Sequence, residues 1–135
     1  MDKEFEKWGV GAEVIVASAH KVPEKVFEIV STNNENEEDI VYITVAGRSN
    51  GLSGVTAANS VHPVIACPPF KDKEDFIMNI NSTLVMPSDT PVLTVIDKGN
   101  AVMAALRIFA LKDSGLRAKI AGRIAEIKEK FNKNA

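Results

Sequence analysis

Cysteine is nearly absent from this sequence, since Cys67 is the single one among 135 residues. A disulfide within these residues is therefore excluded, and this cysteine usage fits a reducing cytosol. Cys67 lies among apolar residues just before Pro68 and Pro69, with no neighbour that would activate its thiol, so we expect it to be buried and inert. The acidic start at Asp2 and Glu4 does not resemble a signal peptide, which favours a cytoplasmic protein.

Long apolar runs and an excess of one charge are also missing. The longest apolar stretch, residues 101–111, is interrupted by Arg107 and is too short to cross a bilayer. The formal net charge of -2 gives no reason to expect nucleic acid or a membrane surface as a partner. The remaining composition, 45% apolar and 25% charged, predicts one globular domain over residues 1–135.

The signature motifs of several enzyme classes are missing too. The sequence contains no cluster with metal-ligand spacing, no Walker loop, no dinucleotide fingerprint and no Gly-x-Ser-x-Gly elbow. A metalloenzyme, a P-loop ATPase, a typical dehydrogenase and a typical hydrolase are therefore disfavoured.

The residues that are present alternate between short apolar runs and stretches long enough for helices. Runs rich in valine and isoleucine without polar alternation are typical of parallel strands covered on both faces, which need right-handed crossovers. The sequence thus predicts an α/β domain with a three-layer α/β/α sandwich. The expected strands are 13–17, 40–45, 64–66 and 92–96, and the expected helices are 23–32, 51–60, 73–80, 100–111 and 114–131.

The last two predicted helices have the clearest apolar patterns. Residues 100–111 are apolar almost all round, which predicts burial on more than one side, either as a central core helix or at an oligomer interface. Residues 114–131 instead carry one apolar stripe, which must dock on its own domain or on a neighbouring subunit. The stripe consists of Leu116, Ile120, Ile124, Ile127 and Phe131.

Two loops carry side chains suited to an anionic ligand, and each follows an expected strand. Residues 18–21 read Ser-Ala-His-Lys, and residues 46–52 read Ala-Gly-Arg-Ser-Asn-Gly-Leu. Ligands of open α/β sheets bind beyond the carboxyl ends of the strands, so we expect both loops at one edge. An ordinary turn is the alternative for residues 46–52, but a turn does not require the guanidinium fork of Arg48.

His20 is the one plausible proton carrier in this combined site, because an imidazole can take and return a proton near neutral pH. His62, just before an expected strand, is interpreted as structural or solvent-facing. A third loop, residues 84–91, is a proline-stiffened turn that could form a wall of the pocket.

Five sequence blocks follow one another in a recognisable order. They are Ser-Ala-His-Lys (18–21), Ala-Gly-Arg-Ser-Asn-Gly-Leu (46–52), Pro-Val-Ile-Ala-Cys-Pro-Pro (63–69), Met-Pro-Ser (86–88) and Asn-Ala-x-x-x-Ala-x-x-Ile-Phe-x-Leu (100–111). Together they resemble the aminoimidazole ribonucleotide carboxylase and mutase family of purine biosynthesis. Members that rearrange N5-carboxyaminoimidazole ribonucleotide usually carry Ser-Ala-His-Arg and Gly-Gly-Ala-Ala-His, whereas members that use carbon dioxide directly carry Ser-Ala-His-Lys and Gly-Arg-Ser-Asn. The chain resembles the second class.

The resemblance implies carboxylation of 5-aminoimidazole ribonucleotide by carbon dioxide, with the mutase reaction as the nearest alternative. It implies a parallel flavodoxin-like sheet, a homo-octamer, and no metal, biotin or nucleotide cofactor. His20 and Lys21 would be catalytic, with His20 as the proton shuttle. The implied substrate-binding residues are Ser18, Ala19, Gly47, Arg48, Ser49, Asn50, Gly51, Met86, Pro87 and Ser88.

The chain departs from the family pattern at its start. Family members usually begin with a further strand and a Gly-Ser-x-Ser-Asp loop that binds the phosphate, whereas this sequence begins within the helix that follows, at residues 2–8. With this first strand missing, we expect either a gap in the sheet or pairing of the two flanking strands. The sequence is then either a truncated member or a degenerate one with a rebuilt sheet, and a non-catalytic assembly subunit is a further alternative.

Overall fold

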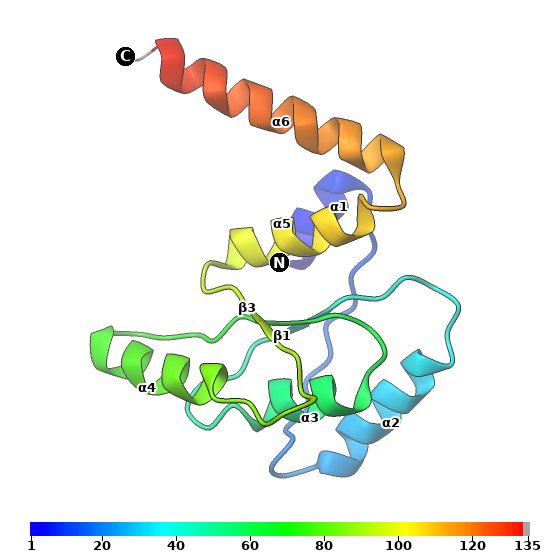
Figure 1. Cartoon of the computed structure of the whole chain (residues 1–135), viewed down its shortest axis with the longest axis vertical. Helices are drawn as coiled ribbons and strands as arrows, with labels where there is room; N and C mark the ends of the chain where they lie inside the picture. Colours follow the sequence, from blue (N-terminus) through cyan, green and yellow to red (C-terminus); the bar gives the residue numbers. More distant parts are fainter. Residues whose placement is uncertain (134–135) are drawn as a thin grey trace.

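The computed structural model describes residues 1–133 and shows a small parallel sheet with helices on both faces (Figure 1). The three strands are β1 (Tyr42–Thr44), β2 (Val64–Ala66) and β3 (Leu93–Thr94), in the order β1-β2-β3. Tyr42 lies opposite Val64, and Ile65 lies opposite Leu93. The helices are α1 (Asp2–Trp8), α2 (Pro23–Asn34), α3 (Gly51–Asn59), α4 (Lys73–Leu84), α5 (Lys98–Phe109) and α6 (Ser114–Lys133).

Local capping explains where several helices begin. The side chains of Asn50, Asp72 and Asp97 each accept a hydrogen bond from the backbone N–H three residues later, which satisfies one of the free donors of the first turn. Pro23 occupies the first turn of α2, where its missing N–H costs nothing. The cap at Asp97 places the start of α5 at Lys98, slightly before the predicted start.

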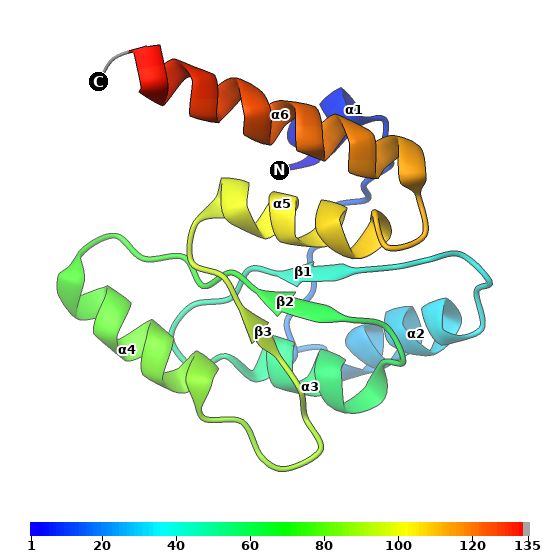
Figure 2. The same ribbon diagram turned by 45° about the horizontal axis from the view of Figure 1, so that its top comes forward.

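The helices form a layer on each side of the sheet (Figure 2). Helices α2, α3 and α4 cover one face, and α5 covers the other face together with α1. Helix α6 packs on the outer side of α5. All of β2 is buried, because both of its faces are covered. The predicted three-layer α/β/α sandwich with a parallel, flavodoxin-like sheet is confirmed.

Helix α5 lies at the centre of the core, which explains why residues 100–111 are apolar almost all round. Ala101, Ala105 and Leu106 are at most 1% exposed, and they belong to one buried cluster with Ile65 of β2. Burial of a side chain the size of leucine or isoleucine stabilises a fold by about 1.5–3 kcal/mol. Packing within one chain therefore accounts for the apolar character of this helix, as expected for a central core helix. Within residues 1–133, no helix has both the length and the apolar content that crossing a membrane requires.

Only the first half of α6 uses its apolar stripe within the chain. Leu116 and Ile120 are 4% and 6% exposed in the core cluster with α5. Further along the same stripe, Ile124, Ile127 and Phe131 are 38%, 39% and 74% exposed. The stripe docks on its own domain for about two turns and then leaves the body of the molecule, as the orange and red helix of Figure 1 shows.

Residues 13–17 do not form the predicted strand, so that prediction is wrong. The segment runs past the sheet without a ladder partner, and Val14 and Val16 are 73% and 85% exposed. A strand needs a neighbour for its backbone N–H and C=O groups, but β1 pairs with β2 alone. The segment is held instead by Lys25, whose Nζ donates to the carbonyl oxygen of Val16 at 2.9 Å. The expected pairing of the two flanking strands therefore does not occur.

Candidate functional site

His20 lies in a tight turn that leads into α2. The backbone N–H groups of Lys21 and Val22 donate to the Ser18 carbonyl oxygen at 3.2 and 2.9 Å, and the Lys21 N–H also lies 3.3 Å from Ser18 Oγ. This turn leaves the side chains of His20 and Lys21 exposed to solvent. The local hydrogen bonds therefore present an imidazole and an ammonium group on one loop.

The imidazole of His20 packs against the first residue of α3. A Cβ atom placed on Gly51 would lie 2.7 Å from His20 Cε1 and 2.8 Å from Nε2, closer than atoms can approach. Only glycine therefore allows this arrangement. The contact brings residues 18–21 and 46–52 together, as expected, although residues 13–17 form no strand and only the second loop follows a strand of the sheet. It also places the ring beside the first turn of α3.

Arg48 has an unusual backbone conformation, with φ of 60° in the left-handed region. Its N–H donates to the side-chain oxygen of Asn79 on α4, and the N–H of Asn50 donates to Ser82 Oγ at 2.8 Å. The Arg48 side chain is exposed, and within residues 1–133 its guanidinium has neither a hydrogen bond nor a salt bridge. The loop thus holds the backbone of Arg48 firmly and leaves its cation available to a ligand.

Asn50 uses its side chain within the protein. It is 5% exposed, and its Oδ1 accepts hydrogen bonds from the N–H and the hydroxyl of Ser53, at 3.2 and 2.8 Å. Its Nδ2 donates to Thr83 Oγ1 at 2.9 Å. Both amide atoms are therefore engaged, so Asn50 shapes the loop, whereas Ser49 beside it is exposed. The resemblance implies that Asn50 binds substrate, and its side-chain amide is occupied within the protein.

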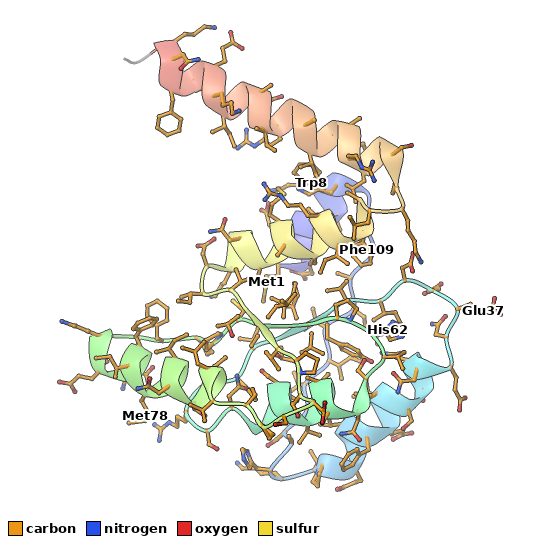
Figure 3. The ribbon with its side chains drawn as sticks, viewed as in Figure 1. Met1, Trp8, Glu37, His62, Met78 and Phe109 are labelled. Atoms are coloured by element: carbon orange, nitrogen blue, oxygen red, sulfur yellow. The ribbon has the colours of Figure 1, made fainter. Side chains whose placement is uncertain are left out.

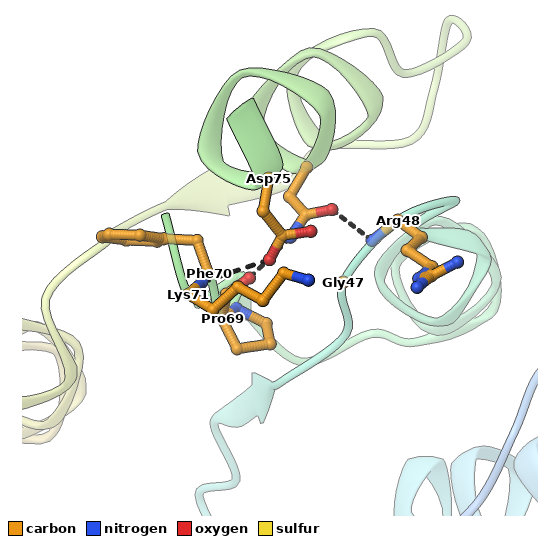
Figure 4. Close-up of a pocket in the computed structure, with 7 residues that line it drawn as sticks. Gly47, Arg48, Pro69, Phe70, Lys71 and Asp75 are labelled. Carbon is orange, nitrogen blue, oxygen red and sulfur yellow. Dashed lines mark hydrogen bonds between the residues drawn. The ribbon is translucent and has the colours of Figure 1, made fainter. Parts of the chain in front are cut away.

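An open hollow adjoins the Arg48 loop (Figure 4). Arg48 and Lys71 bring two cations to it, and Asp75 accepts a hydrogen bond from the Lys71 N–H at 3.2 Å. Phe70 packs edge-on against Phe76, with ring centroids 5.1 Å apart. The lining residues are Gly47, Arg48, Pro69, Phe70, Lys71, Asp75 and Asn79. Of these, the lining residues from Pro69 to Asn79 were not predicted from the sequence. The signal that could have indicated them is the spacing of Asp75 and Asn79, which places both on one face of α4.

The Met-Pro-Ser turn contacts α3. The sulfur of Met86 lies 3.4 Å from the position of a Cβ on Gly54, one turn beyond Gly51. Pro87 and Ser88 are exposed, and Pro87 borders a separate open hollow. The structure therefore brings His20, Gly51 and the Arg48 loop together and places residues 86–88 further along α3.

His62 and Cys67 have structural environments, as the sequence indicated. His62 Nε2 lies 2.8 Å from the carbonyl oxygen of Asn33, beside α2 and on the opposite side of the molecule from Met78 of α4 (Figure 3). Cys67 is 2% exposed, and burial raises the pKa of its thiol. A raised pKa lowers the fraction of reactive thiolate at neutral pH, so Cys67 suits the core and not nucleophilic chemistry.

Comparison with known proteins identifies the family of the chain. A family model described as AIR carboxylase matches residues 1–130. The phosphoribosylaminoimidazole carboxylase of Archaeoglobus fulgidus is 48% identical over 113 residues, which cover 84% of this chain and 61% of that protein. The N5-carboxyaminoimidazole ribonucleotide mutase of Methanocaldococcus jannaschii is 43% identical over 131 residues, which cover 96% of this chain and 78% of that protein.

A crystal structure of Treponema denticola PurE superposes with a TM-score of 0.89 at 30% identity, covering 98% of this chain and 83% of that one. The chain thus spans most of the length of that structure and about three fifths of the Archaeoglobus relative. The fold, the five sequence blocks and the match over residues 1–130 lead to one conclusion: the chain belongs to the AIR carboxylase family, the carboxylases and mutases of purine biosynthesis.

Proposed function

We propose that this protein carboxylates 5-aminoimidazole ribonucleotide with carbon dioxide, giving 4-carboxy-5-aminoimidazole ribonucleotide. The observation that carries the proposal is the packing of the His20 imidazole against Gly51, at the start of α3 and beside the Arg48 loop. This contact puts a base next to the positive end of helix α3 and near a cation. A reaction that creates a carboxylate and releases a proton needs those three elements.

In the proposed reaction, the electron-rich ring carbon attacks carbon dioxide and forms the new carbon–carbon bond. The proton that this carbon still carries must then leave so that the ring regains its aromaticity, and His20 takes it. Lys21 and Arg48 balance the charges of the phosphate and the new carboxylate. Ser18, Ser49 and nearby backbone N–H groups orient the reactants. In this account Asn50 acts by shaping the loop.

The mutase reaction is a second candidate. The Methanocaldococcus relative, at 43% identity, is named N5-carboxyaminoimidazole ribonucleotide mutase. The same groups would serve if the carboxyl group came from the N5 nitrogen of the substrate. The same ring carbon would lose its proton to the base, and the cations would balance the same phosphate and carboxylate. The Ser-Ala-His-Lys and Gly-Arg-Ser-Asn loops favour the carboxylase.

Isotope incorporation distinguishes the two reactions. We expect purified protein given 5-aminoimidazole ribonucleotide and ¹³C-bicarbonate to form labelled product faster than a blank without protein. A mutase would instead convert N5-carboxyaminoimidazole ribonucleotide into product that stays unlabelled in ¹³C-bicarbonate. If neither substrate turns over at high protein concentration, both enzymatic proposals are wrong, and a non-catalytic assembly subunit is what remains.

We also propose that the chain assembles into a homo-octamer in the cytoplasm. Support comes from the outer half of α6, where Ile124, Ile127 and Phe131 expose a continuous apolar stripe that a monomer would leave in water. Light scattering should give a mass close to eight times the 14.6 kDa of one chain. A mass of one chain, at the concentration used for the assay, would contradict this assembly.

A further inference from the structure

Asn79 of α4 is a buried polar residue that connects two loops of the site. It is 2% exposed, and each atom of its side-chain amide has a backbone partner. Its Oδ1 accepts the N–H of Arg48, in the loop after β1, and its Nδ2 donates to the carbonyl oxygen of Pro69, after β2, at 2.7 Å. Asn79 therefore joins the two loops that line the hollow of Figure 4.

These partners determine the side chain required at position 79. A backbone N–H can only donate and a carbonyl oxygen can only accept, so the bridge needs one acceptor and one donor on a planar group. Asparagine supplies both at this length. Aspartate has the same size, but when ionised it would place an oxygen against the Pro69 carbonyl. Alanine would leave two partly buried backbone groups without their partners, which costs stability.

The bridge also bears on the backbone conformation of Arg48. Non-glycine residues rarely adopt the left-handed region because it is strained, so neighbouring interactions must hold Arg48 there. Asn79 bonds directly to the N–H of Arg48. Ser82 and Thr83, on the same face of α4, bind the backbone and the side chain of Asn50. This face of α4 thereby sets the path of residues 48–50.

We propose that Asn79 is a positioning residue for the reaction and acts through Arg48. It holds the Arg48 backbone in the left-handed conformation and keeps that loop at a fixed spacing from the Pro69 loop. The guanidinium then lies where a carboxylate or phosphate of the ribonucleotide can meet it. This inference rests on the function proposed above, and it adds a residue outside the loops that carry the chemistry.

A double-mutant cycle tests the link to Arg48. Asn79→Ala should lower kcat/KM by about 10- to 100-fold, because small misplacements of a binding group have effects of that size. In an Arg48→Ala background the same change should lower it by less than about twofold. If the two effects multiply in full, Asn79 does not act through Arg48 and the proposal is overturned.

Two further variants separate positioning from a general loss of stability. Thr56→Val removes the side-chain hydrogen bond of another buried residue, from Thr56 Oγ1 to the Leu52 carbonyl oxygen at 2.8 Å, and should leave kcat/KM unchanged. Asn79→Asp keeps the size of the side chain, so it carries the cycle if Asn79→Ala does not fold. An equal loss of kcat/KM in Thr56→Val would contradict a positioning role.

Hydrogen exchange gives a readout that does not depend on activity. In the protein without substrate, the Arg48 amide should exchange about tenfold faster in Asn79→Ala than in the unmodified protein. The Asn50 amide, bound to Ser82, serves as the internal comparison. If the unmodified protein turns over neither ribonucleotide, the proposed function fails, and this measurement still decides whether Asn79 holds the loop. Unchanged exchange at Arg48 would overturn the inference whatever the activity.

Discussion

Replacing His20 by asparagine should lower kcat by about 10²–10⁴-fold, the usual contribution of a positioned proton carrier. Asparagine is similar in shape to histidine but cannot take the proton from the ring carbon. The His20 side chain is exposed, and within residues 1–133 it makes no hydrogen bond, so the fold should be unaffected. The measurement is product formation at saturating substrate, together with thermal unfolding of both proteins.

His62→Asn is the matched control, because it makes the same chemical change at the other histidine. His62 Nε2 lies 2.8 Å from the Asn33 carbonyl oxygen, so this variant should lose about 1 kcal/mol of stability and keep its turnover. The two histidines should therefore show opposite patterns: activity is lost at His20, and stability is lost at His62. Turnover at the unmodified rate in His20→Asn would rule out His20 as the shuttle.

Adding one methyl group at Gly51 should also remove most of the activity. The new Cβ of Gly51→Ala would lie 2.7 Å from His20 Cε1, so one of the two groups must move. The imidazole is the end of an exposed, flexible side chain, whereas Gly51 is fixed in the first turn of α3. We therefore expect the ring to move by about 1 Å, with a fall in kcat of about 10²-fold.

Stability should change little in Gly51→Ala, because alanine favours helix by up to about 1 kcal/mol and the displaced ring is exposed. Gly122→Ala is a suitable control, since it makes the same change within helix α6, where a Cβ would meet nothing within 4 Å. That variant should keep its turnover and match or exceed the unmodified protein in thermal stability. Full activity in Gly51→Ala, with the His20 ring displaced in its structure, would mean that the contact has no role in catalysis.

Much of the fold could be predicted from the sequence, because the relevant signals are local. The strand expected at 64–66 appears with those bounds, and those expected at 40–45 and 92–96 appear in shortened form. Residues 23–32, 51–60, 73–80, 100–111 and 114–131 all lie mainly in helices. Apolar periodicity and capping residues act over a few positions, so the chain itself carries them.

The strand expected at 13–17 failed for a reason that a local pattern cannot reveal. Its valines and isoleucine have strand propensity, but a strand also needs a partner with free backbone groups beside it. Whether such a partner is present depends on how distant segments pack. Val14 and Val16 are therefore exposed in spite of their apolar character.

The two loops of the candidate site were evident because their residue types stand out after apolar runs, although only the run before residues 46–52 forms a strand. Asn79 did not stand out, since a single asparagine within a helix has many ordinary explanations. Its importance comes from contacts with Arg48 and Pro69, which lie 31 and 10 positions away in the chain. The role of Asn50 as a cap bound to α4 was hidden for the same reason.

By itself, the sequence determined the α/β class, most of the helices and strands, and the two loops with His20 and Arg48. Tertiary structure decided which of these residues touch. It placed the imidazole of His20 against Gly51 and placed Asn79 beneath Arg48. The physical reason is that propensity and apolar periodicity depend on near neighbours, whereas a site depends on contacts between segments far apart in the chain, which exist only after the layers have packed.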